Sequence, residues 1–588
     1  METFHSLLQK RFSDALGKAG FAAAGELTMT TDPRFGDYQS TAALVLGKER
    51  GENPREIAAK ILAHLDVGNL ADPPQIAGAG FINVTLRPST IAKHATYRLR
   101  DERLGVAAST SPRKIVIDFG SPNVAKPMHV GHIRSTVLGD ALARIATFLG
   151  HDVIRDNHIG DWGTQFGMVI WGWKNLLDRQ SLERDPLREI VRIYKETNLR
   201  ATTDPQVREM CRQELVKLQA GDAENIDIWK QCVAFSMQDF ERVYELLDIH
   251  YDIQCGESFY NDRLSGVVER LLKRGIAQMS EGAVVVFFPD IPQLRDNPCI
   301  IRKRDGGYNY ATTDIATLEY RVNDLNRDTL WYVVGAPQTL HFQQIFAIAR
   351  RAGYVADFRH ITFGSILGED RKLMKTRSGE NVPLRDLLEE ACRRARQIVD
   401  EKNPDLNEQD KTDIARVIGI GALKYAELSQ YRMTDYIFSW DKMLSLQGNT
   451  APYLQNAYVR IRSIFRKAGE AASYSYGPVT PRQKEEDARE RRGYSEHLVL
   501  AEPAEIDLAK RLCQFAEIVP QLLNDFRLNI LASYLFELAN TFHRFYESCP
   551  VLKSQEPARN SRLALCNLTG RVLQRGLDLL GVKVPEKM

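Results

Sequence analysis

The sequence has few of the features that mark secreted or membrane-bound proteins. Its 588 residues include only eight cysteines, none in a C-x-x-C pair, so neither a disulfide framework nor a zinc ribbon is predicted. The longest apolar runs, such as AVVVFF at 283–288, have the length of a strand rather than of a membrane span. The first twenty residues carry scattered charges and no apolar core, which argues against a secretory signal. We therefore expect a cytoplasmic protein with reduced thiols and no membrane partner.

A strong charge of one sign is also missing. The chain has 78 basic and 76 acidic residues, so composition alone does not indicate a nucleic-acid partner. Any such partner must be bound by local basic patches. The length of the chain predicts three or four domains.

Changes in pattern along the chain predict four parts. The first begins with a helix over 2–19 and ends in a small, polar linker, and its mixed signals predict an α+β domain. From residue 114 strand, helix and strand alternate, which predicts a doubly wound, Rossmann-like parallel sheet of the α/β class. After about 383 only amphipathic helices are predicted. The boundaries we assign are 1–110, 111–383, 384–447 and 448–588.

Within the sheet region, KIVIDF (114–119) and HDVIRD (151–156) are the first predicted strands, with a helix over 131–149 between them. A mostly helical insertion near 170–250 interrupts the sheet. AVVVFF, TLWYVVG and HITFGSIL are expected to resume it.

The join between the first strand and the first helix, SPNVAKPMHVGHIRSTVLGD, places His129 and His132 on one face of the first helical turn. A metal site would need a third ligand and usually an H-E-x-x-H spacing; neither is present, so we predict no metal. A helix start with incidental histidines is one alternative. A phosphate site is another, because a helix N-terminus offers unpaired N–H groups and a positive dipole end, and Gly131 allows close approach. Open sheets of this kind also bind nucleotides at the carboxyl ends of their strands.

This stretch resembles a known signature. HVGH is similar to the HIGH motif of class I aminoacyl-tRNA synthetases, and SPNVAKPMHVGHIRSTVLGDALAR is similar to the form found in arginyl-tRNA synthetases. The resemblance continues in order over most of the chain, and the first domain resembles the family's N-terminal addition. The further matching segments are GDWGTQFG, QCGESFYN, GYNYATTDIAT, VVGAPQTLHFQQ, MKTRSGENVPLRDLL and GNTAPYLQNAYVRI.

The resemblance implies an ATP-dependent arginine–tRNA ligase. In such an enzyme the arginine carboxylate attacks the α-phosphorus of ATP and pyrophosphate leaves. The 2′-hydroxyl of the terminal adenosine of the tRNA then attacks the adenylate carbonyl. The implied partners are L-arginine, ATP with Mg²⁺, and tRNA-Arg, in a monomeric cytoplasmic protein. By the same resemblance 1–110 contacts tRNA, 384–447 is a helical linker that contacts the stem, and 448–588 is an anticodon-binding domain.

The resemblance also implies an arginine pocket. A guanidinium has five donors and no acceptor, so its pocket must present carboxylate, carbonyl or hydroxyl oxygens. The implied residues are Glu257, Tyr310 and Asp314 around the side chain, and Asp118, Asn123 and Gln338 nearer the amino and carboxylate groups. Taken singly, Asp314 is also explained as a charge near a helix N-terminus, and Asp118 as a residue at a strand end.

For ATP, the resemblance implies His129, Gly131 and His132, which hold phosphate charge together with lysines. One of these is Lys126, just before the histidines, which resembles the lysine that arginyl enzymes use when the lysine of the second class I signature is missing. Neutral imidazoles at this position can donate hydrogen bonds to a phosphoryl group without carrying a fixed charge.

The second signature of class I enzymes, KMSKS, is only partly matched. Aligned on the shared T-R, this chain has Leu373-Met374-Lys375-Thr376-Arg377, so leucine and threonine replace the two lysines. Lys372 or Lys375 would then act in a shifted register. We predict that Lys375 and Arg377 contact phosphate. The alternative is an exposed loop whose charges are merely solvated.

Two other stretches leave alternatives open. In GDWGTQFG the glycines predict tight turns and Asp161 or Thr164 a helix cap, while Trp162 and Gln165 are candidates for the pocket lining. GNTAPYLQNAYVRIRSIFRKAG is either a bundle helix or a surface for single-stranded RNA, where aromatic rings and basic side chains combine. The charged run at 480–494 is predicted to be solvated.

Other classes of protein compete with this interpretation. Another class I synthetase, such as a lysyl enzyme, would need a pocket for a compact ammonium group. A small-molecule nucleotidyltransferase would share H-x-G-H but would not need the helical last third of the chain. A non-catalytic RNA-binding relative would be expected to have lost the histidines or Asp314.

Overall fold

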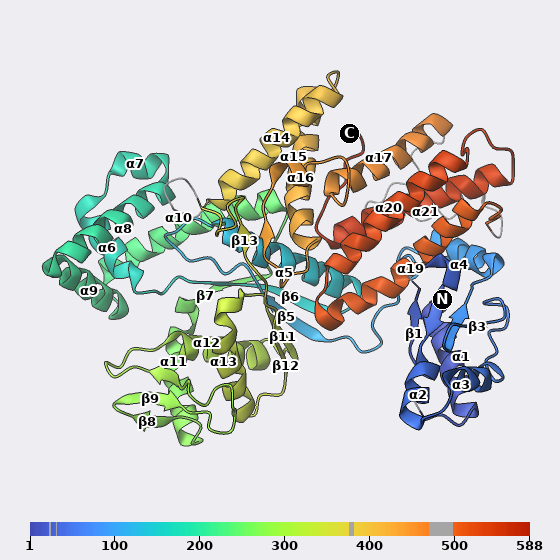
Figure 1. Cartoon of the computed structure of the whole chain (residues 1–588). Helices are drawn as coiled ribbons and strands as arrows, with labels where there is room; N and C mark the ends of the chain where they lie inside the picture. The colour runs from blue at the N-terminus through green and yellow to red at the C-terminus, as the bar shows by residue number, and fades with distance from the viewer. Residues whose placement is uncertain (23–24, 31, 376–381, 470–497) are drawn as a thin grey trace.

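The first hundred residues form an α+β unit at one end of the molecule (Figure 1). The computed structural model describes residues 1–22, 25–30, 32–375, 382–469 and 498–588. In this unit the strands pair antiparallel in the order β1 (Leu27–Met29), β2 (Tyr38–Ser40), β4 (Phe81–Val84), β3 (Gln75–Ala77). Its helices are α1 (Phe4–Lys18), α2 (Ala42–Arg50), α3 (Pro54–Leu62) and α4 (Pro88–Arg100).

A parallel sheet forms the centre of the molecule, as the alternation of strand and helix predicted. Its strands lie in the order β12 (Asp357–His360), β11 (Thr329–Tyr332), β5 (Lys114–Asp118), β6 (Asp152–Ile159), β7 (Ile253–Gly256). Every neighbouring pair is parallel. β5 pairs with β6, the next strand along the chain, on one side and with β11 on the other. The carboxyl end of β5 therefore lies at a switch point, where open sheets of this type bind ligands.

Helices cover both faces of this sheet. Alternate side chains of β5 point to opposite faces: Ile115 and Ile117 share a core with α5 (Val130–Phe148), and Val116 lies in a second core. The helices of the second core are α11 (Asn261–Lys273), α12 (Tyr310–Glu319) and α13 (Thr339–Arg351). Burial on both faces explains why KIVIDF is a continuous apolar run rather than an alternating one.

A helical insertion separates β6 from β7, as predicted. Its helices are α6 (Gln165–Leu176), α7 (Arg179–Arg184), α8 (Pro186–Thr203), α9 (Pro205–Gln219) and α10 (Ala223–Leu247). Asp185, Asp204 and Asp222 cap α8, α9 and α10 by accepting a backbone N–H from the first turn. The insertion extends to one side of the molecule, away from the N-terminal unit (Figure 1).

AVVVFF departs from the prediction. Its strand β9 (Ala283–Val286) does not join the parallel sheet but pairs antiparallel with β8 (Gln278–Ser280) and β10 (Cys299–Arg302). Only two residues separate β8 from β9, which suits a hairpin, whereas parallel pairing needs a crossover of a dozen or more.

Helices fill most of the described chain after 383. They are α14 (Leu384–Lys402), α15 (Glu408–Leu428), α16 (Trp440–Met443), α17 (Ala451–Ala468), α19 (Pro503–Asp525), α20 (Asn529–Ser548) and α21 (Ala558–Leu579). One short strand corrects the prediction that no strand occurs here: β14 (Tyr436–Ile437) pairs in parallel with β13 (Ile366–Leu367). Two residues are too few for a strand pattern to appear in a sequence. Among the described helices, none combines the length and apolar character that crossing a membrane requires.

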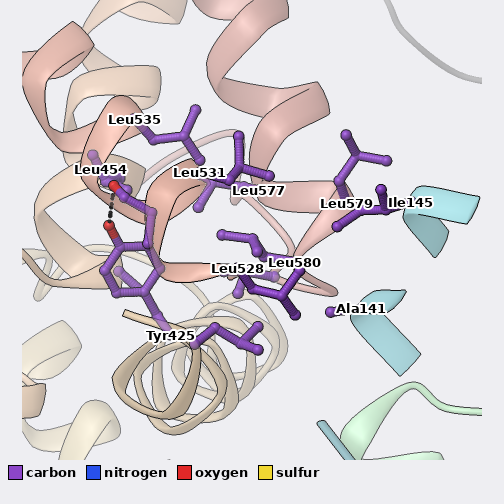
Figure 2. Close-up of a cluster of buried hydrophobic side chains, with 14 of the residues drawn as sticks. Ala141, Ile145, Tyr425, Leu454, Leu528, Leu531, Leu535, Leu577, Leu579 and Leu580 are labelled. Carbon is purple, nitrogen blue, oxygen red and sulfur yellow. Dashed lines mark hydrogen bonds between the residues drawn. The ribbon is translucent and has the colours of Figure 1, made fainter. Parts of the chain in front are cut away.

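The C-terminal helices pack directly on α5 (Figure 2). Ala141 and Ile145 of α5 are fully buried, with Ile145 beside Leu579 at the end of α21 and Ala141 beside Leu580, which follows it. Tyr425 of α15 belongs to the same cluster and donates its hydroxyl to the carbonyl of Ala532 at 2.8 Å. The helix that begins at the two histidines is thus held by the C-terminal helices as well as by the sheet.

The N-terminal unit docks on α19. His5 donates its backbone N–H to the carboxylate of Glu517 at 3.1 Å, and Tyr38 donates its hydroxyl to the same carboxylate at 2.9 Å. Lys510 of α19 pairs with Asp37 at 2.8 Å. The first and last parts of the chain are therefore joined by specific polar contacts.

Candidate functional site

The predicted site residues gather at the carboxyl edge of the parallel sheet. Asn123, Lys126, His129 and His132 follow β5, Glu257 directly follows β7, and Gln338 follows β11 in the short helix η4 (Ala336–Gln338). Asp314 in α12 reaches the same edge through its contact with His341 of α13. Parallel strands all end at one edge, so residues far apart in the sequence meet there.

His129 and His132 cap the helix that they begin. His129 is the N-cap of α5, with extended φ and ψ of −122° and 169°, and its Nδ1 accepts the N–H of Gly131 at 3.1 Å. Nδ1 of His132 accepts the N–H of His129 at 3.0 Å. The two rings form a reciprocal capping box in which imidazole nitrogens replace the usual hydroxyl and carboxylate oxygens.

These capping bonds make Nε2 the proton-bearing nitrogen of each ring. A neutral imidazole has one acceptor and one donor nitrogen, and here Nδ1 is the acceptor. Burial lowers the pKa of His132 to about 3, and burial together with nearby Lys126 lowers the pKa of His129. Two fixed, uncharged N–H donors therefore stand at the positive end of α5, which suits a phosphoryl group. The helix-start and phosphate interpretations of this motif are compatible, because they use different nitrogens.

Two glycines let the loop after β5 pack closely. A Cβ on Gly131 would lie 2.9 Å from Cε1 of His129, and a Cβ on Gly160 would lie 2.2 Å from Oδ1 of Asn123. The backbone of 122–124 is hydrogen-bonded on both sides of Gly160, at 3.0 Å each. The exposed side chain of Asn123 is thus held against the end of β6.

The end of the second signature segment lies beside the first signature. Residues 128–130 and 382–384 pair through backbone hydrogen bonds of 2.8 and 2.9 Å. Upstream, β13 opens into a hairpin in which Leu367 pairs with Leu373. The structure therefore brings the two segments together, although some 250 residues separate them in the chain.

The lysines of the two segments are solvent-exposed where the structure describes them. Lys126 follows β5, with Nζ 5.6 Å from the ring centroid of Tyr194 in α8. Lys372 and Lys375 lie on the second arm of the hairpin that follows β13. Arg377 lies outside the described residues.

Three carboxylates surround the end of β7. Burial raises the pKa of Glu257, the charges of Asp314 and Asp161 raise it further, and nearby His158 lowers it. Burial also raises the pKa of Asp161. Carboxylates that are buried and repel one another are stabilised by a bound cation, and a planar guanidinium can serve several of them at once.

Asp161 supports the turn that carries Glu257. It accepts the N–H and the hydroxyl of Ser258 at 2.8 and 2.6 Å, at the start of the short helix η2 (Glu257–Tyr260). A Cβ on Gly256 would lie 2.0 Å from Oδ2 of Asp161, so this contact needs glycine. Asp161 is therefore not the N-cap residue of a helix: it binds the first turn of η2 from outside, where Gly256 is the N-cap. Thr164 is the N-cap of α6, without a side-chain bond.

Asp314 has a partner that sequence reasoning missed. His341 donates from Nε2 to Oδ2 of Asp314 at 2.5 Å; burial lowers the pKa of His341, but the hydrogen bond and charge of Asp314 raise it by more. His341 lies in the matched segment VVGAPQTLHFQQ, yet its partner is 27 residues away. Asn309 caps α12, not Asp314. Tyr310, which is 66% exposed, and the exposed Gln338 lie on the side of the site that is open to solvent.

Asp118 lies one layer beneath the other predicted residues. It is 5% exposed, and its carboxylate accepts hydrogen bonds from Arg321 at 2.7 Å and from the hydroxyl of Ser121 at 3.0 Å. The fully buried Arg321 also donates to Asp156 at 2.9 Å. The carboxylate of Asp118 is thus used in buried contacts at the end of its strand. Among the predicted substrate contacts, that of Asp118 agrees least with the structure.

The remaining stretches have mainly structural contacts. Trp162 packs edge-on against Trp229, with ring centroids 5.4 Å apart. In α17 the buried Phe465 belongs to the core, and Arg462 pairs with Glu586 at 2.9 Å, as expected for a bundle helix. The charged run at 480–494 lies outside the described residues. Within the described chain, no three His, Cys, Asp or Glu side chains form a set that could hold a metal ion.

Three consecutive parts of the chain match known protein families. Residues 6–86 match the arginyl tRNA synthetase N terminal domain. Residues 95–440 match the catalytic domain of class I tRNA synthetases (R), and 454–588 match the DALR anticodon binding domain.

Similar proteins extend over the whole chain. An arginine–tRNA ligase of Cyanothece sp. is 44% identical over 592 residues, covering 99% of this chain and 98% of that protein. The arginine–tRNA ligase of Thermobifida fusca is 44% identical and covers 99% of both. Among solved structures, arginyl-tRNA synthetase of Plasmodium falciparum has a TM-score of 0.83 at 29% identity over all of both chains. That of Thermus thermophilus has a TM-score of 0.81 at 25% identity, over 99% of this chain and 100% of that one.

Proposed function

The chain belongs to the arginyl-tRNA synthetases, and on that premise we propose how its site performs their reaction. The protein is an arginine–tRNA ligase: it activates L-arginine with ATP as arginyl-adenylate and transfers the arginyl group to the 3′-terminal adenosine of tRNA-Arg, releasing AMP and pyrophosphate. The observation that carries this conclusion is the match to arginine–tRNA ligases along the whole chain.

In the proposed activation step, an oxygen of the arginine carboxylate attacks the α-phosphorus of ATP. The bond from that phosphorus to the bridging oxygen breaks, and pyrophosphate leaves with the electron pair. The Nε2–H groups of His129 and His132 donate to phosphate oxygens as charge shifts, while Gly131 leaves room for the nucleotide. Lys126, Lys375 and Arg377 neutralise the leaving group. The protein contributes positioning and electrostatic stabilisation rather than a covalent intermediate.

The proposed arginine pocket is the acidic group beside β7. Glu257 and Asp314 pair with the guanidinium, and Tyr310 covers it from the open side. The raised pKa of Glu257 supports this assignment, because a bound cation would relieve the burial and repulsion that raise it. A competitor without five donors would leave buried carboxylates unpaired, which gives a discrimination of about 10⁴ or more.

Asn123 and Gln338 hold the amino and carboxylate groups of arginine, and Asp118 acts beneath them through Ser121 and Arg321. Mg²⁺ enters with ATP as the counter-ion of its phosphates. Residues 1–110 contact tRNA, 384–447 contact its stem and 448–588 bind its anticodon. The protein works as a monomer in the cytoplasm.

ATP–pyrophosphate exchange tests this function. We expect exchange with arginine and not with lysine, and we expect it to require tRNA-Arg. Exchange in the presence of lysine would contradict the assignment of arginine as the substrate. Exchange at a rate that does not depend on arginine would contradict it as well. Robust exchange with arginine in the absence of tRNA would contradict the tRNA requirement alone.

A further inference from the structure

A buried ion pair joins the helix that carries the histidines to α15. Arg134 lies two residues after His132, and its Nε is 3.0 Å from Oε2 of Glu427; both side chains are 1% exposed. Neither residue belongs to the proposed substrate contacts. Removing two charges from water is costly, so a pair of this kind is weak support for stability by itself.

The geometry of this pair is also poor for stabilisation. Within the described chain Nη2 of Arg134 has no hydrogen-bond partner, and Nε alone of this guanidinium contacts Glu427, at 3.0 Å from Oε2. Burial raises the pKa of Glu427 to about 7, although the charge of Arg134 and the hydroxyl of Tyr436 lower it. Unsatisfied polar atoms in a buried site cost free energy. The pair therefore needs an explanation other than stability.

Both partners hold the segment at β14. Tyr436 donates its hydroxyl to Oε1 of Glu427 in a short hydrogen bond. Arg134 donates to the carbonyl of Thr434 at 3.1 Å, and its guanidinium lies 5.4 Å from the ring centroid of Tyr436. The position of β14 is thus set jointly by α5 and α15.

β14 in turn holds the base of the lysine hairpin. Tyr436 pairs with Ile366, and Ile437 with Leu367, in the parallel pairing of β13 with β14. A Cβ on Gly364 would lie 2.7 Å from Oδ1 of Asp435, so the two segments approach closely just before they pair. Eight residues after Leu367 the chain reaches Lys375.

We propose that Arg134 and Glu427 are positioning residues for adenylate formation. Through Tyr436 they set the distance between the Nε2 donors of the two histidines and the lysines of the hairpin after β13. The inference rests on the proposed role of those groups as phosphate contacts. Glu257 follows β7 and Asp314 lies in α12, and neither β7 nor α12 pairs with β13 or β14, so loss of the pair should impair the phosphate side of the site and leave arginine binding unchanged.

A double variant, Arg134→Met with Glu427→Leu, tests this by replacing the charges with apolar groups of similar size. Such exchanges are often neutral or stabilising, so a thermal midpoint near that of the wild type is expected. We expect ATP–pyrophosphate exchange to fall between about 10- and 100-fold, with a raised KM for ATP and an unchanged KM for arginine. Wild-type exchange in the folded variant would overturn the proposal, and so would an equal rise in both KM values.

Tyr436→Phe removes only one hydroxyl and serves if the double variant does not fold. A fall in kcat with an unchanged KM for arginine is expected, and unchanged kinetics would overturn the proposal. The matched control is Glu189→Gln, since Glu189 is also a buried glutamate, paired with Arg192 at 2.6 Å in the helical insertion; it should shift the thermal midpoint without changing kcat. His129→Asn separates the two hypotheses: if it too leaves exchange unchanged, the phosphate role itself has failed.

Discussion

Nδ1 of His129 accepts the backbone N–H of Gly131 at 3.1 Å, so one nitrogen of this ring belongs to the helix cap and only the other can serve a ligand. His132 divides its nitrogens in the same way, with Nδ1 on the N–H of His129. Replacing either histidine by alanine therefore removes a cap and a donor at once. Experiments on this motif need variants that separate the two.

His129→Asn is such a variant, because asparagine caps helices well but does not carry a donor to the position of Nε2. We expect a thermal midpoint near that of the wild type and adenylate formation slower by about 10²–10³-fold. His129→Ala should show the same loss of rate and a lower midpoint as well. Wild-type exchange by the asparagine variant would leave His129 with the capping role alone.

Gly256→Ala should weaken arginine binding selectively. The added Cβ would meet Oδ2 of Asp161, which supports the turn bearing Glu257, so the carboxylate must shift. We expect the KM for arginine to rise about tenfold or more, while the KM for ATP stays the same. Gly17→Ala in α1, where a Cβ meets nothing within 4 Å, is the matched control and should change neither. Equal effects on both substrates would show that the turn does not act on arginine specifically.

The pair of His341 and Asp314 predicts a pH dependence of stability. Asp314 raises the pKa of folded His341 above its ordinary 6.5, so the folded state binds the proton more tightly than the unfolded state. The stabilisation is fully present below pH 6.5 and is lost as the pH rises through the raised folded value. Thermal midpoints of the wild type and His341→Asn should differ most near pH 5.5 and converge at higher pH. A difference that grows with pH would contradict this sign.

Arg321→Met should destabilise the protein strongly, because it leaves Asp118 and Asp156 as unpaired buried charges. Breaking a buried pair in this way costs about 3–5 kcal/mol, which a large drop in the thermal midpoint would show. Adding Asp156→Asn should recover part of the loss, since it removes one of the uncompensated charges. A midpoint like that of the wild type in Arg321→Met would mean that solvent reaches these three side chains.

Alanine substitutions identify which lysines contact phosphate. Lys126, Lys372 and Lys375 are exposed, so their removal should not alter folding. We expect Lys126→Ala and Lys375→Ala to slow exchange by about 10- to 100-fold, and Lys372→Ala to behave like the wild type. Slow exchange in Lys372→Ala together with wild-type exchange in Lys375→Ala would instead assign the phosphate contact to Lys372. Wild-type exchange in all three variants would refute the phosphate role of the lysines.

Sequence reasoning recovered the parts of this protein that depend on local pattern. The alternation from KIVIDF to HDVIRD predicted the parallel sheet, and the placement of HVGH at the end of the first strand predicted a site at the carboxyl edge. That edge holds Glu257 and Gln338 for the same reason, since every strand of a parallel sheet ends there, whereas Asp314 of α12 is brought to it by its contact with His341.

The rest depends on contacts that no local pattern encodes. The strand of AVVVFF pairs with its own neighbours, and apolar periodicity does not specify which sheet a buried strand joins. His341 meets Asp314 across 27 residues, and Arg134 meets Glu427 across nearly 300. That the histidine rings cap α5 follows from the backbone angles at His129, which spacing alone does not determine.

The leucines of the C-terminal helices that cover Ala141 and Ile145 bear on the evolution of the molecule. Ala141 lies nine residues after His132, about 14 Å along the axis of the same helix. Substitutions in the C-terminal helices must therefore keep the volume of this contact, or the helix shifts and carries both rings with it. The C-terminal helices therefore cannot be exchanged independently of α5, and we expect the two to have diverged together.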